Sequence, residues 1–345
     1  MMCGSLWYDG RSRFVYPAAM SQPPFQVQLA SSRETAEADD RLLARITFGP
    51  VTGSDADDPR RIQVGLPALL DGPDSELWHT DAPVTRGWRD DIGFAHTDRL
   101  LFARIHLPDS SDAAAAAREA YARLLDFHRS MGYPALLRIW NYFDRLLAPA
   151  GDSGLDRYQA FCAGRHDALE AAGLDAAALP AATAIGTDSP GFLVYLLAAR
   201  EAGDPIENPR QVSAYRYPPD YGPRSPTFSR ATLKDWPSGA HLYISGTASI
   251  VGHASRHEGD VRAQVDEIID NLEALIGNVS RGHGLDTLAG PGDLSLIKVY
   301  VKHARDLEAV HERIRARIGT YPAMLFLHGD ICRRELLVEI EGLYA

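Results

Sequence analysis

The segment 206–232, IENPRQVSAYRYPPDYGPRSPTFSRAT, concentrates side chains that bind anions. Its four arginines and three tyrosines are Arg210, Arg216, Arg224, Arg230, Tyr215, Tyr217 and Tyr221. A guanidinium group binds a carboxylate through two hydrogen bonds, and a tyrosine hydroxyl adds orientation. Prolines restrict the backbone here, which favours fixed side-chain positions, although a solvated basic loop is the alternative. Because the whole chain carries a net charge of −11, this local cluster predicts a carboxylate-binding site.

A second candidate lies in the C-terminal run CRRELLVEIEGLYA. Its alternation predicts a strand with apolar side chains on one face, namely Leu336, Val338 and Ile340. Glu339 and Glu341 fall on the other face, together with Leu337. A carboxyl group in a buried strand is costly unless it has a partner or a chemical role. The pattern leaves two alternatives open, a central strand with a functional glutamate and an edge strand with exposed glutamates.

Other motifs point away from metal and cofactor chemistry. His253 and His257 have an i, i+4 spacing, but neither an HExxH context nor a third ligand accompanies them. The sequence contains no Gly-rich phosphate loop, no GxSxG elbow and no CxxC pair. The three cysteines, Cys3, Cys162 and Cys332, are too widely separated for a disulfide framework or a zinc site. We therefore expect neither a metal nor a cofactor.

Composition limits the partners. With 35 basic against 46 acidic residues, nucleic acid is not expected as the main partner. No run of 18 or more apolar residues predicts a membrane span. The first 25 residues lack the apolar block of a signal peptide, so we expect a cytoplasmic protein. A length of 345 residues favours two domains or one duplicated unit.

The elements that position these residues form two similar blocks. In the first, strands are expected at 100–107, 136–143, 183–185 and 192–199, and helices at 112–131 and 155–172. In the second, strands are expected at 241–251, 294–301, 323–327 and 336–342, and helices at 260–276 and 307–318. The order β-α-β-α-β-β therefore occurs twice, and the repeat lies in the element order rather than in the sequence.

The remaining regions are less regular. Residues 42–48 and 62–70 are expected to be strands within an otherwise mixed N-terminal stretch. The connection 204–239 is long and polar, and we expect it to lack regular structure and to be functional. These features predict one domain over 1–203 and a second over 204–345, which comprises the connection and the C-terminal block.

Several segments together resemble the chorismatases. They are LLRIWNYFDRLL (136–147), LDRYQAFCAGR (155–165), TAIGTDSPGFLVYLLAARE (183–201), the segment 206–232, LYISGTASIVGHASRHEGD (242–260) and CRRELLVEIEG (332–342). The second half is also similar to YjgF-type domains, the fold of imine and enamine deaminases. The resemblance implies an α/β (α+β) fold of duplicated YjgF-like domains, with mixed sheets and helices packed on one face. Where the deaminases carry an arginine after a Pro-Ala pair, this chain has Met324, which argues against deaminase chemistry.

The resemblance implies a reaction and a set of site residues. Chorismatases cleave chorismate and release pyruvate without a cofactor. The resemblance implies that Glu339 is the catalytic acid of this chain. Gly246 and Cys332 match positions typical of the members that form 3-hydroxybenzoate, a branch of which also forms 4-hydroxybenzoate. With the carboxylate-binding pattern, the expected substrate-binding residues are Arg224, Arg230, Tyr217, Tyr221 and, as a weaker candidate, Arg157.

Three alternatives remain open at this point. A chorismate hydrolase would give pyruvate and a dihydroxycyclohexadienoate. A YjgF-like imine deaminase would need an arginine in place of Met324, and a ligand-binding protein would need no acid at Glu339. The expected partner is a small molecule, chorismate, and the sequence leaves a homo-oligomer open.

Overall fold

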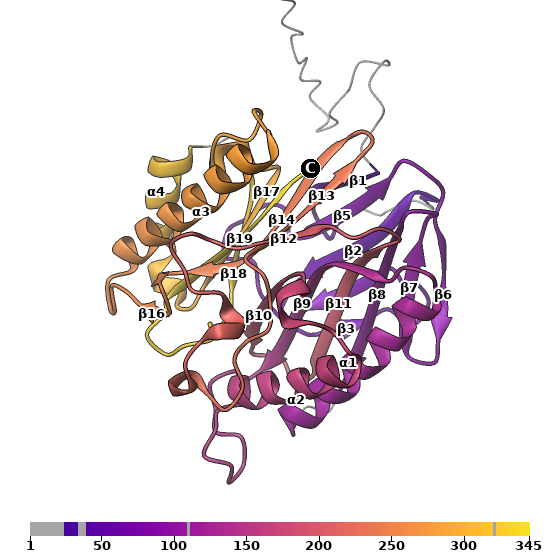
Figure 1. Ribbon diagram of the computed structural model, residues 1–345, viewed down its shortest axis with the longest axis horizontal. Coiled ribbons are helices and arrows are strands. Elements are labelled where there is room, and N and C mark those ends of the chain that lie inside the picture. Colours follow the sequence, from indigo (N-terminus) through magenta and orange to yellow (C-terminus); the bar gives the residue numbers. More distant parts are fainter. Residues whose placement is uncertain (1–23, 34–38, 109–110, 320–321) are drawn as a thin grey trace, which may run out of the picture.

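Three large β-sheets, a two-stranded sheet of β15 (Ile250–Val251) and β16 (Ala254–Ser255), and four α-helices are the main elements of the structure, a computed structural model that describes residues 24–33, 39–108, 111–319 and 322–345 (Figure 1). Two sheets have six strands, and the third has five. Side chains from all three sheets meet in one apolar cluster, which includes Trp78, Tyr195 and Tyr300. None of the described helices is long and apolar enough to cross a bilayer.

The first six-stranded sheet carries both helices of the first block on one face. Its strands are β6 (Thr85–Arg89), β7 (Ile92–His96), β8 (Leu100–Leu107), β9 (Ala135–Asp144), β10 (Ala181–Thr187) and β11 (Phe192–Ala199). Helices α1 (Ala113–Ser130) and α2 (Arg157–Ala171) pack together on this sheet through an apolar cluster. Asp112 and Asp156 cap the two helices by accepting hydrogen bonds from backbone N–H groups of the first turn.

The second six-stranded sheet has the same arrangement. Its strands are β12 (Asp204–Ile206), β13 (Ala231–Trp236), β14 (Gly239–Ala248), β17 (Leu296–Val301), β18 (Ala323–His328) and β19 (Val338–Tyr344). Helices α3 (Val261–His283) and α4 (Leu307–Ile318) pack on one of its faces. The spatial order β12-β13-β14-β19-β17-β18 reproduces the order β6-β7-β8-β11-β9-β10 of the first sheet. In each sheet the last two strands in this order are parallel, so the predicted duplicated α/β fold is confirmed.

Two regions differ from the expectation. The N-terminal stretch forms a separate sheet in the order β1-β5-β2-β4-β3, from β1 (Phe25–Ala30), β2 (Leu42–Phe48), β3 (Gly53–Ser54), β4 (Arg61–Val64) and β5 (Ser75–Thr80). The strand expected over 62–70 ends at Val64, because the chain turns at Gly65 and continues into Pro67. The connection 204–239 is not without structure, since β12 and β13 extend the second sheet. The domain boundary at 203/204 remains a prediction.

The two six-stranded sheets meet where β10 runs beside β13 and β14. The backbone N–H of Ala182 donates to the Ser245 hydroxyl at 2.9 Å, and that of Gly246 donates to the Thr183 hydroxyl at 2.9 Å. The Ala181 N–H donates to the Thr232 hydroxyl at 2.8 Å. This seam joins the two copies of the fold, and the main cavity opens beside it.

Candidate active site

A cavity of about 280 Å³ lies at the seam between the two six-stranded sheets. Its walls come from α2, β10, β14, the connection 204–239 and the segment that leads into β19. The polar side chains on these walls include Asn141, Asp156, Tyr158, Gln159, Arg165, Thr183, Tyr217, Asp220, Tyr221, Arg230, Arg333, Arg334, Glu335 and Glu339. The cavity therefore combines several guanidinium groups with a carboxyl group at its inner end.

Glu339 reaches the cavity from the interior of the second sheet. Its strand β19 lies between β14 and β17, so the alternative of an exposed edge strand is wrong. The side chain is buried, and this burial, with the nearby Glu341 carboxylate, raises the pKa of Glu339 to about 8 against the opposing influence of Arg138 and Arg230. Near neutral pH Glu339 is therefore a protonated acid that faces a cavity.

Gly246 provides the space for this acid. It lies on β14 within an irregularity of the pairing with β19, between Ile244 and Thr247. A Cβ at position 246 would overlap the Glu339 carboxyl oxygen Oε1. Any larger residue would therefore displace the carboxyl group, which gives a physical reason for glycine at this position.

Glu341 lies on the same face of β19 as Glu339, but its carboxyl group is ionised. Arg138 Nη2 lies 2.9 Å from Glu341 Oε2, and Lys298 Nζ lies 2.7 Å from Oε1. The Trp140 indole N–H donates to Oε1 at 2.9 Å. Although burial raises the pKa of Glu341, Lys298 and Arg138 outweigh it and hold the pKa at about 2. One strand thus carries a neutral carboxyl and an ionised carboxylate two residues apart.

The connection supplies part of the predicted carboxylate site. Arg230 is buried, and its Nη2 donates to the Tyr217 hydroxyl and to the Val212 carbonyl, each at 2.8 Å. Its Nε has no hydrogen-bond partner within the described part of the chain. The Tyr221 hydroxyl lies 3.2 Å from His253 Nδ1. The structure therefore brings Arg230, Tyr217 and Tyr221 together at the cavity.

Comparisons with known proteins agree with this geometry. A family model described as "Chorismatase FkbO/Hyg5-like, N-terminal" matches residues 76–198. A protein from Streptomyces rapamycinicus named "Chorismatase" is 42% identical over 277 residues, which are 79% of this chain and 82% of that protein. The chain belongs to the chorismatase family. A "3-hydroxybenzoate synthase" from Streptomyces hygroscopicus is 38% identical over 295 residues, covering 81% of this chain and 84% of that protein.

A solved member of the chorismatase family has the same fold over nearly the whole chain. The crystal structure of a chorismatase matches with a TM-score of 0.87 at 37% identity, covering 93% of this chain and 98% of that chain. Because the match covers 93% of this chain, it includes the N-terminal sheet. The three-sheet architecture is thus shared with this solved chorismatase.

Two of the arginines expected to bind substrate, Arg224 and Arg157, do not line the cavity. Arg224 is exposed and does not line the cavity. Arg157 is buried at the start of α2, where its guanidinium group binds the Asp144 carboxylate at 3.1 Å and the Ser111 carbonyl at 3.0 Å. Arg157 therefore stabilises the loop that leads into α2. The sequence positions of Arg157 and Arg224 did not show where their side chains point.

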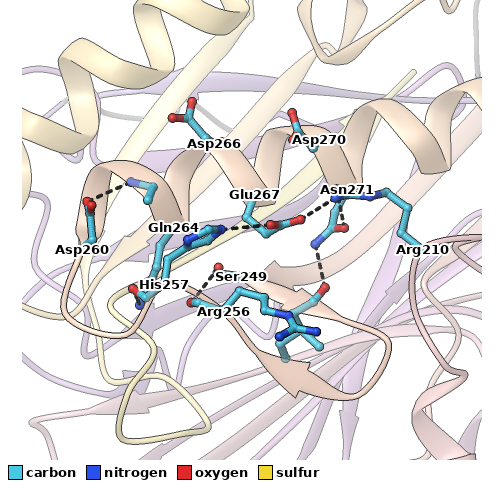
Figure 2. A network of polar contacts seen from close by, with 12 residues as sticks. Arg210, Ser249, Arg256, His257, Asp260, Gln264, Asp266, Glu267, Asp270 and Asn271 are labelled. Atoms are coloured by element: carbon cyan, nitrogen blue, oxygen red, sulfur yellow. Dashed lines mark hydrogen bonds and ion pairs between the residues drawn. The ribbon is translucent and has the colours of Figure 1, made fainter.

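Arg210 does not line the cavity and pairs with a glutamate of α3 (Figure 2). Its Nη2 lies 2.6 Å from Glu267 on α3, whose other carboxyl oxygen lies 3.1 Å from His257 Nε2. Asn271 accepts a hydrogen bond from Arg210 Nη1 at 2.9 Å and donates to the Ile250 carbonyl at 3.0 Å. This network attaches the connection to α3.

The sequence did not point to three arginines of the cavity, Arg165, Arg333 and Arg334. Arg165 on α2 is 3% exposed and lies over the Tyr121 ring, and its Nε and Nη2 have no hydrogen-bond partner among the residues described. Arg333 stacks on the Tyr221 ring at 3.9 Å and donates to the His253 carbonyl at 2.9 Å. The available signal for Arg165 was its position one helical turn after Cys162 on the apolar face of the predicted helix.

Cys332 lines the same cavity, as does Cys162 on α2. Burial and then the nearby Glu339 carboxyl raise the pKa of Cys332, so the group is a thiol rather than a thiolate. Burial likewise raises the pKa of Cys162 to about 12. In the part of the chain that the structure describes, no three His, Cys, Asp or Glu side chains are grouped as metal ligands.

Proposed function

We propose that this protein cleaves chorismate to pyruvate and 3-hydroxybenzoate, with Glu339 as the proton donor. The observation that carries the proposal is a buried carboxyl group with a raised pKa that faces a cavity rich in arginine. The names of the relatives, "Chorismatase" and "3-hydroxybenzoate synthase", give the substrate and product class.

The arginines of the cavity suit a substrate with two carboxylates. Chorismate carries one carboxylate on its ring and one on its enolpyruvyl side chain. Arg230, hydrogen-bonded to Tyr217, and Arg165 both line the cavity, and neither is paired with a carboxylate among the described residues, so each can bind a carboxylate of the substrate. Since Arg165 comes from α2 and Arg230 from the connection, the two groups approach the ligand from different walls.

Glu339 performs the difficult step of the proposed reaction. A neutral carboxylic acid protonates the terminal methylene carbon of the enolpyruvyl group, which becomes a methyl group, and an oxocarbenium ion forms. The bond between the ring carbon and the ether oxygen then breaks, and pyruvate leaves. Because general acids need a pKa near the working pH, the pKa of about 8 at Glu339 suits this role.

The fate of the ring distinguishes the members of this family. In the proposed route the neighbouring ring hydroxyl attacks the ring carbon, displaces pyruvate, loses its proton and forms an epoxide. The bond between the epoxide oxygen and its original carbon then breaks, the oxygen takes up a proton, and loss of a ring proton gives 3-hydroxybenzoate. Two protons are taken up, at the methylene carbon and at the epoxide oxygen, and two are released, from the hydroxyl and from the ring, so no water enters. The thiol of Cys332 lies on the cavity wall near Glu339, where its bulk would exclude water from the ring.

Product analysis tests the proposal directly. The purified protein is incubated with chorismate in the presence of a chelator, pyruvate is measured enzymatically, and the aromatic products are separated by chromatography. We expect one pyruvate for each 3-hydroxybenzoate, with 4-hydroxybenzoate as a second aromatic product if the chain belongs to the branch that makes both. Pyruvate with a dihydroxycyclohexadienoate would instead assign a hydrolase, and absence of pyruvate would overturn the proposal.

A further inference from the structure

A cluster of four buried charges lies behind the catalytic strand, outside the main cavity. It consists of Glu76 on β5, Arg138 on β9, Lys298 on β17 and Glu341 on β19, and we call it the four-charge cluster. Every one of these side chains is at most 4% exposed. All three sheets contribute to the cluster, so it connects the N-terminal sheet to the strand that carries Glu339.

Lys298 is shared between two carboxylates. Its Nζ lies 2.7 Å from Glu341 Oε1 and 2.9 Å from Glu76 Oε1. The second oxygen of Glu76 accepts a hydrogen bond from the Trp78 indole at 2.8 Å, which fixes the carboxylate on the N-terminal sheet. With Arg138 on the other side of Glu341, the two cations and two carboxylates of the cluster balance.

This balance matters because Glu339 is close. Glu339 and Glu341 are two residues apart on one face of β19, which separates them by roughly 6.5 Å. A buried group at this distance responds to a net charge in the cluster, because the surrounding side chains are dry and screening is weak. An unbalanced cation would favour the carboxylate form of Glu339, and an unbalanced anion would favour the neutral acid.

We propose that Glu76 is a positioning residue for the proton donor: by balancing Lys298, it keeps the four-charge cluster neutral and thereby keeps Glu339 protonated. The inference rests on the proposed role of Glu339. Glu76 does not line the cavity and cannot touch the substrate, so it acts only through Lys298 and Glu341.

The other groups that face Glu339 do not replace this contribution. Titratable and charged side chains lie around it on β9, β17, the connection, α2, its own strand and the segment before it, namely Arg138, Tyr300, Arg230, Tyr158, Cys162, Arg165, Glu341, Cys332 and Arg333. Of these, Arg138 and Arg230 favour the carboxylate, whereas burial and Glu341 favour the acid. Glu341 opposes the two arginines fully only while Lys298 is itself balanced.

A titration of the carboxyl group tests the inference without relying on activity. The protein is labelled with ¹³C at the glutamate side-chain carboxyl, and the Glu339 signal is assigned by its absence in Glu339→Gln. In Glu76→Gln the midpoint of Glu339 should fall by about one pH unit, the effect of one charge near 10 Å at an effective dielectric constant of 20. In Lys298→Gln it should rise, and in the double variant Glu76→Gln/Lys298→Gln it should return towards the wild-type value.

The matched control is Asp58→Asn. Asp58 also belongs to the N-terminal sheet region and pairs with a buried arginine, Arg60, at 2.8 Å, but it has no contact with the four-charge cluster. This variant should lose stability and leave the Glu339 midpoint unchanged. An unchanged midpoint in Glu76→Gln, or an equal shift in Asp58→Asn, would overturn the inference. If Glu76→Gln does not fold, Lys298→Gln is compared with the double variant. Equal Glu339 midpoints in these two proteins would then overturn the inference.

Enzyme kinetics separate this inference from the proposed function. In Glu76→Gln the pH at which kcat/KM for pyruvate release begins to fall should move down with the NMR midpoint, while KM at low pH stays unchanged. If Glu339→Gln keeps full activity but the midpoints move as expected, the acid assignment fails and the cluster's effect on Glu339 stands. If Glu339→Gln is inactive and the Glu339 midpoint does not move in Glu76→Gln, the acid assignment stands and the proposed role of Glu76 fails.

Discussion

Strand β11 of the first sheet and strand β19 of the second occupy the same place in the duplicated fold. Each lies between the strand that precedes the first helix of its block and the strand that follows it. Each also turns alternate side chains towards its own helices, such as Val194 in β11 and Ile340 in β19. The two strands therefore have equivalent surroundings on their outer faces.

Their inner faces differ. In β11 this face carries Leu193, Tyr195 and Leu197, which pack into the apolar cluster shared by the three sheets. In β19 the same face carries Glu339 and Glu341, both buried. Since a buried carboxyl group costs free energy that an apolar side chain does not, the second copy has given up packing on this face. The inner face thus serves packing in the first copy and carries two carboxyl groups in the second.

Replacing Glu339 by Gln should have the largest effect. The variant keeps the shape of the side chain but removes the acidic proton, so pyruvate release from chorismate should fall by about 10²–10⁴-fold, as expected for a general acid. Single-turnover pyruvate assays measure the loss. Tyr195→Phe, on the inner face of β11, is the control and should keep its activity; comparable losses in both variants would contradict the difference between the two copies.

Replacing Glu341 by Gln should lower stability, and it should also lower the pKa of Glu339, because the Glu341 carboxylate favours the neutral acid. The change leaves Arg138 and Lys298 buried without a full counter-charge. Breaking a buried ion pair from one side costs about 3–5 kcal/mol, which urea unfolding would measure. Glu339→Gln should cost far less, because the acid it replaces is already neutral. A stable Glu341→Gln protein would show that the carboxylate is not required to balance these cations.

The cavity arginines should control binding, with Arg224 as the control. Removing Arg230 or Arg165 takes away a buried partner of a substrate carboxylate, so each alanine variant should weaken binding by about 2–5 kcal/mol, measured as a rise in KM or by titration calorimetry. Arg224→Ala should change neither, because that side chain is exposed outside the cavity. If Arg224→Ala weakens binding as much as the other two, the connection changes conformation when substrate binds.

Activity should depend on pH through Glu339. The proton donor must be protonated, and its pKa of about 8 lies above the ordinary value for glutamate. The rate should therefore be constant from weakly acidic to neutral pH and fall about tenfold per pH unit above the pKa. A profile of kcat/KM against pH measures this limb. A fall centred near pH 4 to 5 would mean that the carboxyl group is not desolvated as the structure has it.

Local sequence patterns predicted the framework because helix and strand periodicity depend on neighbouring residues. The alternation in 336–342 correctly placed Glu339 and Glu341 on one face. It could not distinguish their roles, because Arg138, which pairs with Glu341, comes from a strand far away in the sequence. Arg165 was missed because its place on the apolar face of a predicted helix does not show that this face borders a cavity. The strand β13 was missed because the surrounding connection is rich in proline and arginine, and only pairing with β14 shows it to be a strand.

The smallest expected effect concerns the product rather than the rate. Cys332→Ala removes the sulfur atom from the cavity wall near Glu339 and leaves space of the order of one water molecule, roughly 15 Å³. Water can then compete with the ring hydroxyl for the activated intermediate, so chromatography should detect more dihydroxycyclohexadienoate and less 3-hydroxybenzoate. Gly246→Ala is a poor probe of the same idea, because its methyl group would displace Glu339 itself. Cys162→Ala is the better comparison, since it enlarges the cavity by the same amount from α2. If both cysteine variants shift the products equally, added volume alone admits the water; if neither does, the thiol at position 332 does not direct the product.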